Sequence, residues 1–344
     1  MYLAFKELVF SKWKYALIVS FISLIAFLIY FLSGLAFGLA NNNRSAVDHW
    51  QAQSVYVTKY ANKNLALSQI FPQGTSAPKD STALRLSNVV AESDYGKDDG
   101  VVFSIDSDNF LKPKLDKGTW LSKAGEVVVD QGLADGKVQL GQKIALNGYS
   151  DKFTVVGLTN DNRYNTLPVI YLNQADYQQV FKTQAINGYI SKTTDKNIDA
   201  NLERLSIPDL IKSIPGYQPQ VQTFTLMIAA LFIIVAFIIT IFMYILTIEK
   251  QAVYGIMRAQ GISTKQIIIS LIDQALLLGV VGVGLALVAN LLVAAVIPAA
   301  VPYNNNPWLI TGFSFGMIFA IVLGTIFSII KVIKIDPLDA LGGR

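Results

Sequence analysis

The chain contains no cysteine and a single histidine, His49, among its 344 residues. Without cysteine it can form no disulfide bond, so any folded domain must be stable through its own core. It also lacks the G-x-x-x-x-G-K-[ST] loop with which many ATPases cradle phosphates. With one histidine and no thiol, it offers no evident pair of nucleophile and base. We therefore expect a chain that is not an enzyme and binds no cofactor or metal of its own.

Charged side chains are absent from three long stretches, residues 15–40, 223–248 and 274–330. A helix needs roughly 20 apolar residues to cross a bilayer, so each of the first two stretches predicts one transmembrane helix. The third is too long for one crossing, and the Pro and Asn residues between Pro298 and Pro307 interrupt it. This predicts a third span at 266–297 and a fourth at 308–330.

The net charge of +4 arises outside the large polar region, because residues 41–222 carry nineteen acidic and nineteen basic side chains. The surplus falls in three short segments: Lys6, Lys12 and Lys14; Lys250, Arg258 and Lys265; and Lys331, Lys334 and Arg344. Positive segments favour the cytoplasmic side. We therefore expect a protein of the cell membrane with both termini on the cytoplasmic side, where residues 1–14 form an interfacial amphipathic helix and residues 331–344 a tail. Residues 41–222 and the 298–307 loop are expected on the extracellular side.

Residues 41–222 predict an extracellular α+β domain. Alternating or β-branched runs predict strands at 54–60, 101–105, 126–130, 142–147, 152–158, 168–172 and 188–192. Asn147-Gly148 predicts a hairpin turn, and helices are expected at 176–181, with Asn173 as a cap, and at 197–205. The polar segment 65–99 is expected to be an exposed loop. Its acidic residues and those that follow, Asp94, Asp98, Asp99, Asp106 and Asp108, lack the spacing of a calcium loop and are expected to be solvated.

The fold class predicted is thus membrane α-helical, with four transmembrane helices and an α+β domain between the first and the second. Between the second and third spans, residues 249–265 form a basic segment. From Glu249 to Arg258 its residues favour a short helix interrupted only by Gly255, Gly261 favours a stop, and Ser263 can cap the next helix. Such a helix at a membrane surface can serve as a lever. The alternative is a plain turn held by lipid phosphates.

The run E-K-x-x-x-x-G-I-x-R-A-x-G at 249–261, the one large domain between spans one and two, and the ending Ile335-Asp336-Pro337-Leu338-Asp339-Ala340-Leu341 resemble permease subunits of MacB/FtsX-type ABC transporters. The resemblance implies a coupling helix that docks into a separate ATPase, which would bind ATP and Mg²⁺. It places this contact on Glu249, Lys250, Gly255, Arg258, Ala259 and Gly261.

The same resemblance implies a homodimer with two ATPase copies. Gly34 and Gly38 are spaced as a small-x-x-x-small pair, which lets helix backbones approach closely, and are therefore candidates for a dimer contact. Nothing in the sequence indicates a nucleic-acid partner.

The run Ser33–Leu39, with Asn43, Ser45 and Asp48 after it, is most similar to permeases of Gram-positive haem-efflux pumps. This implies haem, or a similar amphiphile, as cargo. Haem needs an apolar slot and axial ligands or polar partners, and the candidates near the first two spans are Asp48, His49, Tyr30, Met227 and Tyr244. Two other functions remain open: export of an antimicrobial peptide or antibiotic, and a signal relay to a cell-surface enzyme.

Overall fold

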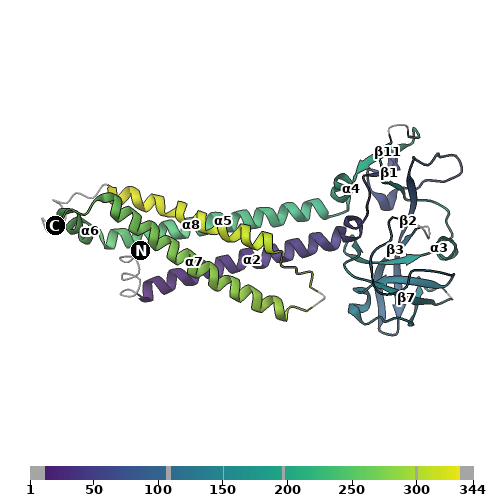
Figure 1. Cartoon of the computed structure of the whole chain (residues 1–344), viewed down its shortest axis with the longest axis horizontal. Coiled ribbons are helices and arrows are strands. Elements are labelled where there is room, and N and C mark those ends of the chain that lie inside the picture. Colours follow the sequence, from purple (N-terminus) through teal and green to yellow (C-terminus); the bar gives the residue numbers. More distant parts are fainter. Residues whose placement is uncertain (1–11, 106–109, 150, 196–197, 299–300, 334–344) are drawn as a thin grey trace. The chain divides into compact units, whose positions relative to one another are not determined.

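The structure is a computed structural model that describes residues 12–105, 110–149, 151–195, 198–298 and 301–333. The chain forms two compact units. One is a helical bundle built from residues up to 37 and from 222 onward, and the other, residues 38–221, is called the sheet domain below (Figure 1). The interfacial helix expected at 1–14 lies almost entirely outside the described residues, as does the 335–341 motif.

Four long helices form the bundle (Figure 1): α2 (Lys12–Asp48), α5 (Tyr217–Glu249), α7 (Thr264–Val296) and α8 (Pro307–Ile333). Each is long and apolar enough to cross a membrane. The four predicted spans are therefore confirmed as helices, and each helix extends beyond the uncharged residues that predicted it. The first helix runs eight residues past Ala40 and ends inside the sheet domain.

The bundle is held together by an apolar core and by glycines at close helix contacts. Core residues from all four helices include Ile22, Ile239, Leu271 and Ile321. The α5 and α8 backbones approach closely at Gly324, where an added Cβ would stand 2.6 Å from the carbonyl oxygen of Ala236. The Thr240 hydroxyl donates a hydrogen bond to the Gly324 carbonyl at 3.0 Å. Only glycine leaves room for this approach.

Within its described residues the sheet domain contains eleven strands, whose main path runs β11-β1-β10-β2-β3-β9-β5-β7-β4. Their bounds are β1 Ser54–Thr58, β2 Ser81–Ser93, β3 Gly96–Ser104, β4 Leu115–Gly118, β5 Glu126–Asp130, β6 Lys143–Leu146, β7 Phe153–Thr159, β8 Arg163–Tyr164, β9 Leu167–Leu172, β10 Gly188–Ser191 and β11 Leu202–Ser206. Two short helices accompany them, α3 (Gln174–Phe181) and α4 (Ile207–Ser213).

Part of this sheet closes on itself. β2 pairs with β3, β3 with β9, β9 with β5, β5 with β7, β7 with β6, and β6 returns to β2. A closed ring leaves no open edge among these strands. Its side chains form a buried apolar cluster that includes Val102, Val127, Val155 and Ile170. We call this ring the barrel.

Most predicted strands are present, and two sequence predictions are wrong. The expected loop at 65–99 contains β2, the longest strand, together with the start of β3. The helix expected at 197–205 is instead strand β11 over its described second half. The sequences of β2 and β11 look polar because one face of each strand is exposed. Pairing with neighbouring strands nevertheless makes both segments extended: Leu205 lies opposite Val55 of β1, and Leu86 lies opposite Phe103 of β3. Tertiary packing overrides local propensity here.

The predicted hairpin turn and helix cap are confirmed. Asn147 and Gly148 both have positive φ, 51° and 69°, between β6 and β7, and Asn173 caps α3. Asp98, expected to be solvated, is instead half-buried in β3 and accepts a hydrogen bond from the Ala134 amide at 2.7 Å. Within the described residues no group of His, Asp and Glu side chains could hold a metal ion, and Asp106 and Asp108 lie outside those residues.

We predict that Gly324→Ala destabilises the bundle. The new methyl group would collide with a backbone oxygen of α5, and overpacking of this kind typically costs about 1–3 kcal/mol. The matched control is Gly312→Ala, because nothing lies within 4 Å of a Cβ placed there. Thermal unfolding of the detergent-solubilised protein should show a lower midpoint for the first variant and an unchanged or higher midpoint for the second.

Candidate functional site

The segment between the second and third spans folds as a separate short helix, α6 (Gln251–Ala259). Lys250 departs from helical geometry (φ −98°, ψ 7°) and separates α6 from α5. Gly261 adopts a positive φ of 90° and stops the segment, and Ser263 starts α7 with a reciprocal capping box to Gln266. The predicted short helix, stop and cap are confirmed. Gly255 does not interrupt the helix as expected but continues it.

The α6 helix has two apolar sides. Tyr254 and Gly255 are buried, and Met257 packs against the bundle core. On the other side Val253 and Ile256 are 51% and 44% exposed. Arg258 lies in the last turn, where a cation is favourable, and the nearby Ala259 is exposed. One side of α6 is thus fixed to the bundle while the other presents apolar surface.

A polar chain connects the start of α6 to two spans. The Lys250 ammonium donates a hydrogen bond to the Tyr15 hydroxyl at 3.0 Å and lies 5.6 Å from the centre of its ring. The Tyr15 hydroxyl in turn donates to Gln274 Oε1 at 3.4 Å. Tyr15, in α2, and Gln274, in α7, are buried. The sequence analysis did not identify these partners, because Tyr15 and Gln274 are 259 residues apart.

Glu249 has a partner within the chain. It is the last residue of α5, and its Oε2 lies 2.6 Å from the Lys14 ammonium at the start of α2. Both side chains are about half exposed, 45% and 58%. The structure therefore gives Glu249 a contact that joins α5 to α2, next to α6 but not on it. A direct contact with an ATPase stays a prediction for all six residues assigned to it from the sequence, Glu249 included.

The proposed haem residues do not converge on one described site. Tyr30 is fully buried, and its hydroxyl shares a 2.5 Å hydrogen bond with Ser314 of α8. Met227 and Tyr244 are 44% and 42% exposed on α5. They are seventeen residues apart, which is ~26 Å along a helix. These two residues therefore cannot both contact one porphyrin on the same chain.

Asp48 and His49 lie together at the end of α2. Asp48 ends the helix and pairs with Arg44 one turn before it, at 2.8 Å. The His49 backbone N–H donates to the Ser45 carbonyl at 3.3 Å, and its side chain is exposed. An exposed imidazole beside a half-exposed carboxylate can offer a nitrogen ligand and a polar partner to an incoming group. Their role as haem ligands stays a prediction.

The two glycines predicted for a dimer contact are both buried within the chain. A Cβ on Gly34 would stand 2.5 Å from the ring of Tyr303, and the Gly34 carbonyl accepts a hydrogen bond from the Asn304 amide at 3.1 Å. Gly34 thus gives room to the segment joining α7 and α8. A dimer contact through Gly34 and Gly38 stays a prediction.

The run Gly312-Phe313-Ser314-Phe315-Gly316 has the G-x-S-x-G spacing of serine hydrolases. That motif requires a sharp turn between a strand and a helix. Here the run lies inside helix α8, and the Ser314 hydroxyl is bonded to Tyr30 and to the Ile310 carbonyl. It therefore lacks the geometry of a nucleophile.

Comparisons with known proteins agree with this architecture. Residues 225–337 match the family described as FtsX-like permease C-terminal. Putative hemin transport system permease proteins HrtB are similar over their full length. The protein of Staphylococcus haemolyticus is 26% identical, and that of Staphylococcus epidermidis 28%, with 100% of this chain and 99% of each relative covered.

Among solved structures, the extracellular domain of the noncanonic ABC-type transporter YknZ from Gram-positive bacteria is similar at 12% identity and a TM-score of 0.34. It covers 45% of this chain. The residues matched to the permease family span α5, α6, α7 and α8. The similarity to this permease family therefore covers the second, third and fourth of the long apolar helices and the short α6 between them.

Proposed function

We propose that this chain is the permease subunit of an ABC-type efflux pump that exports haem or a similar amphiphile, driven by a separate ATPase. The observation that carries the proposal is α6, a short helix fixed to the bundle on one side and apolar and exposed on the other. It lies inside the matched permease domain. The full-length similarity to putative hemin permeases supports the cargo.

In this proposal α6 is the handle on which the ATPase acts. ATP binding brings two ATPase subunits together and displaces α6. The displacement reaches α5 through the chain itself, α2 through Lys250 and Tyr15, and α7 through the Ser263 cap. The Lys14–Glu249 pair keeps α2 and α5 together at the same level. The chain's residues thus transmit force, and hydrolysis belongs to the partner.

The orientation follows from charge. Lys14, Lys250, Arg258 and Lys265 gather at the ends of helices α2, α6 and α7, and positive segments favour the cytoplasm. This charge pattern supports an orientation in which α6 faces the cytoplasm, where ATP is available, and the sheet domain lies outside the cell membrane. The similar Staphylococcus proteins support a Gram-positive type of cell membrane.

Two copies of the chain would form the pump. The interior between the four helices is filled by large side chains such as Ile29, Tyr30 and Met243, each fully buried. A packed interior offers no route for a porphyrin through one chain. A route between two copies, each with its own ATPase, meets this constraint.

The exposed side of α6 generates the first prediction of this section. We expect Val253→Asp with Ile256→Asp to lower recovery of the ATPase with the affinity-tagged permease by about tenfold or more, since burial of each side chain stabilises a complex by about 1.5–3 kcal/mol. The control is Leu67→Asp, which changes an exposed leucine of the sheet domain. Equal recovery of ATPase by all three proteins would contradict docking on α6.

A charge swap distinguishes an internal role of Glu249 from a direct contact with the ATPase. Lys14→Glu and Glu249→Lys should each reduce ATP-driven export. Folding should change little, because exposed ion pairs contribute about 0–1 kcal/mol. The double variant restores the pair in reverse and should recover export. If Glu249 contacts the ATPase directly, the double variant will stay as impaired as Glu249→Lys.

Cargo is tested with haemin itself. We expect the purified permease to shift the Soret band of haemin at micromolar concentration, and haemin to stimulate hydrolysis by the permease–ATPase complex. His49→Ala should change the position of the bound Soret band, because an axial nitrogen is lost, without lowering the melting temperature. Tyr60→Ala, at a position 93% exposed, is the control. If a strain lacking the chain becomes sensitive to an antibiotic but not to haemin, the cargo is another compound and not haem.

A further inference from the structure

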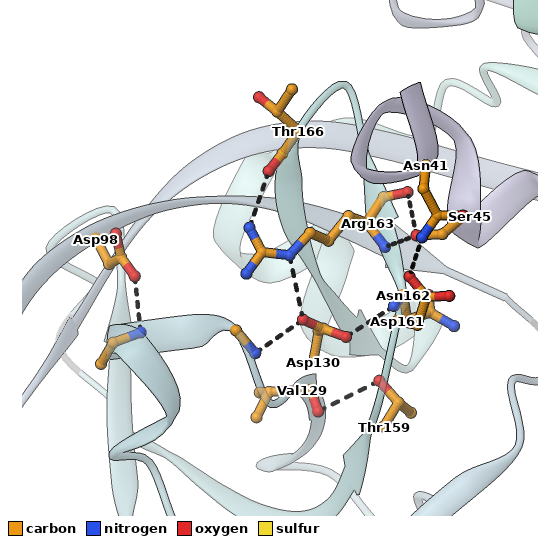
Figure 2. Close-up of polar contacts among 12 residues, drawn as sticks. Asn41, Ser45, Asp98, Val129, Asp130, Thr159, Asp161, Asn162, Arg163 and Thr166 are labelled. Carbon is orange, nitrogen blue, oxygen red and sulfur yellow. Dashed lines mark hydrogen bonds and ion pairs between the residues drawn. The ribbon is translucent and has the colours of Figure 1, made fainter. Parts of the chain in front are cut away.

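Three of the described carboxylates in the sheet domain are buried, and all three accept hydrogen bonds from backbone amides. Asp130, at the end of β5, is 2% exposed and accepts from the Gly132 and Asn162 amides, both at 2.8 Å (Figure 2). The hairpin of β8 and β9 that begins here is bonded in turn to α2, because the Arg163 amide donates to Ser45 Oγ at 2.9 Å. Asp130 therefore has a structural role: it supports the hairpin that holds the end of α2.

The other two buried carboxylates, 8% and 4% exposed, hold an exposed loop instead. Glu126 Oε2 accepts hydrogen bonds from the Ser122 and Lys123 amides, at 2.7 and 3.1 Å, and from Ser122 Oγ at 3.0 Å. These donors, the Ser122 amide foremost, lower the pKa of Glu126. Asp176 Oδ2 accepts a hydrogen bond from the Gly125 amide at 2.8 Å. The loop from Ser122 to Gly125 is thus fixed near both of its ends by carboxylates that the fold has removed from water.

The fixed loop contributes little to the core, since Ser122, Lys123 and Ala124 are exposed. Removing a carboxylate from water costs free energy that only well-placed hydrogen bonds offset. Most surface loops of small and polar residues form without such support. Buried charges that order a surface loop are expected at a binding site, whose walls must keep their shape before a ligand arrives.

The fixed loop forms one wall of an open cavity of about 430 Å³ in the sheet domain. This volume is within the range of small-molecule sites. The apolar part of the lining, Ile105, Trp120 and Leu121, belongs to or packs against the aromatic core of the domain. The remaining described residues of the lining are polar or small: Ser122, Lys123, Ala124, Asn173, Gln174 and Ala175.

Positive charge prevails on the polar side of this cavity. Among the described residues that line it, Lys123 is the one with a formal charge. The Lys112 ammonium lies 5.5 Å from the centre of the Trp120 ring and adds a second positive charge beside the apolar wall. Gln174 and Ala175 are the first two residues of α3, so the positive end of this helix dipole lies at the cavity. An apolar wall therefore faces groups that favour an anion.

We propose that this cavity binds a small carboxylate with an aromatic or apolar body. The body lies along Ile105, Trp120 and Leu121, and the carboxylate meets the Lys123 ammonium at the start of α3. The loop held by Glu126 keeps Lys123 in place for this contact. The proposal is independent of the proposed function, because it requires neither an ATPase nor a cargo.

The test uses the full chain in nanodiscs, with 2-naphthoate as the probe and 2-naphthamide as an uncharged ligand of similar shape. Bound ligand is measured by equilibrium dialysis, and binding to empty nanodiscs is subtracted. We expect one saturable site that binds the carboxylate about tenfold more tightly than the amide, because only the carboxylate forms a charged hydrogen bond with Lys123. Equal binding of the two ligands, or no binding above that of empty nanodiscs, overturns the proposal.

Ala175 offers a matched pair of variants, since it is exposed, lines the cavity and is the second residue of α3. Ala175→Glu places a negative charge in the cavity, yet an acidic residue at a helix start is favourable, so the melting temperature should not fall. We expect this variant to weaken 2-naphthoate binding by about tenfold or more through charge repulsion. Ala175→Gln, of similar size and uncharged, should change the affinity by less than about threefold.

A second pair of variants tests the cation itself. Lys123→Gln should weaken 2-naphthoate binding by about tenfold and leave 2-naphthamide binding unchanged. The control is Lys137→Gln, at an exposed position of the same domain outside the lining. Undiminished 2-naphthoate binding by both Lys123→Gln and Ala175→Glu would place the probe elsewhere and overturn the proposal.

Discussion

The structure depends on one constraint: a polar group inside a membrane must find its partner within the protein. The bundle satisfies this constraint at two positions along its helices. Near α6, the Tyr15 hydroxyl donates a hydrogen bond to Gln274 and accepts one from Lys250. Sixteen residues further along α7, ~24 Å at the rise of a helix, Asn290 is fully buried and bonds to Tyr303 at 2.6 Å. These bonds fix the register of the helices, which apolar contacts between them would leave free to slide.

Fixed register matters because α2 is one helix of 37 residues, ~55 Å long by the same rise. A bilayer core is ~30 Å thick, so a large part of α2 projects beyond it. At one end it is bonded through Tyr15 and Lys14 to the segment around α6, and at the other it is bonded into the hairpin of the sheet domain.

Features that depend on residues close together in the chain could be predicted from the sequence. Uncharged stretches predicted the four spans, and Gly261 and Ser263 predicted the limits of the segment containing α6. The missed features need partners far along the chain. The segment of β2 looks like a loop until it pairs with β10, β3 and β6, and the barrel closes where Ala91 and Glu92 of β2 pair with Leu146 and Ala145 of β6. Lys14 and Glu249 are 235 residues apart. The hairpin between β8 and β9 combines both difficulties, since its turn residues, Asn165 and Thr166, donate hydrogen bonds to carbonyls of the distant helix α2.

The packed bundle also limits where cargo recognition can occur. With Tyr30 bonded to Ser314 and enclosed, the interior cannot offer a porphyrin a ligand without breaking a buried hydrogen bond, which costs about 1–3 kcal/mol. A ligand that binds to the outer faces of the bundle helices would not have to break this buried hydrogen bond. An open groove of about 610 Å³ lies between α2 and α7, and its lining combines small residues such as Ser20 with larger apolar ones such as Phe27 and Leu285. Met227 and Tyr244 are exposed on α5. In the proposed pump of two copies, selectivity would then arise where faces of the copies meet, and a substitution on those faces would change cargo without changing the fold of either chain.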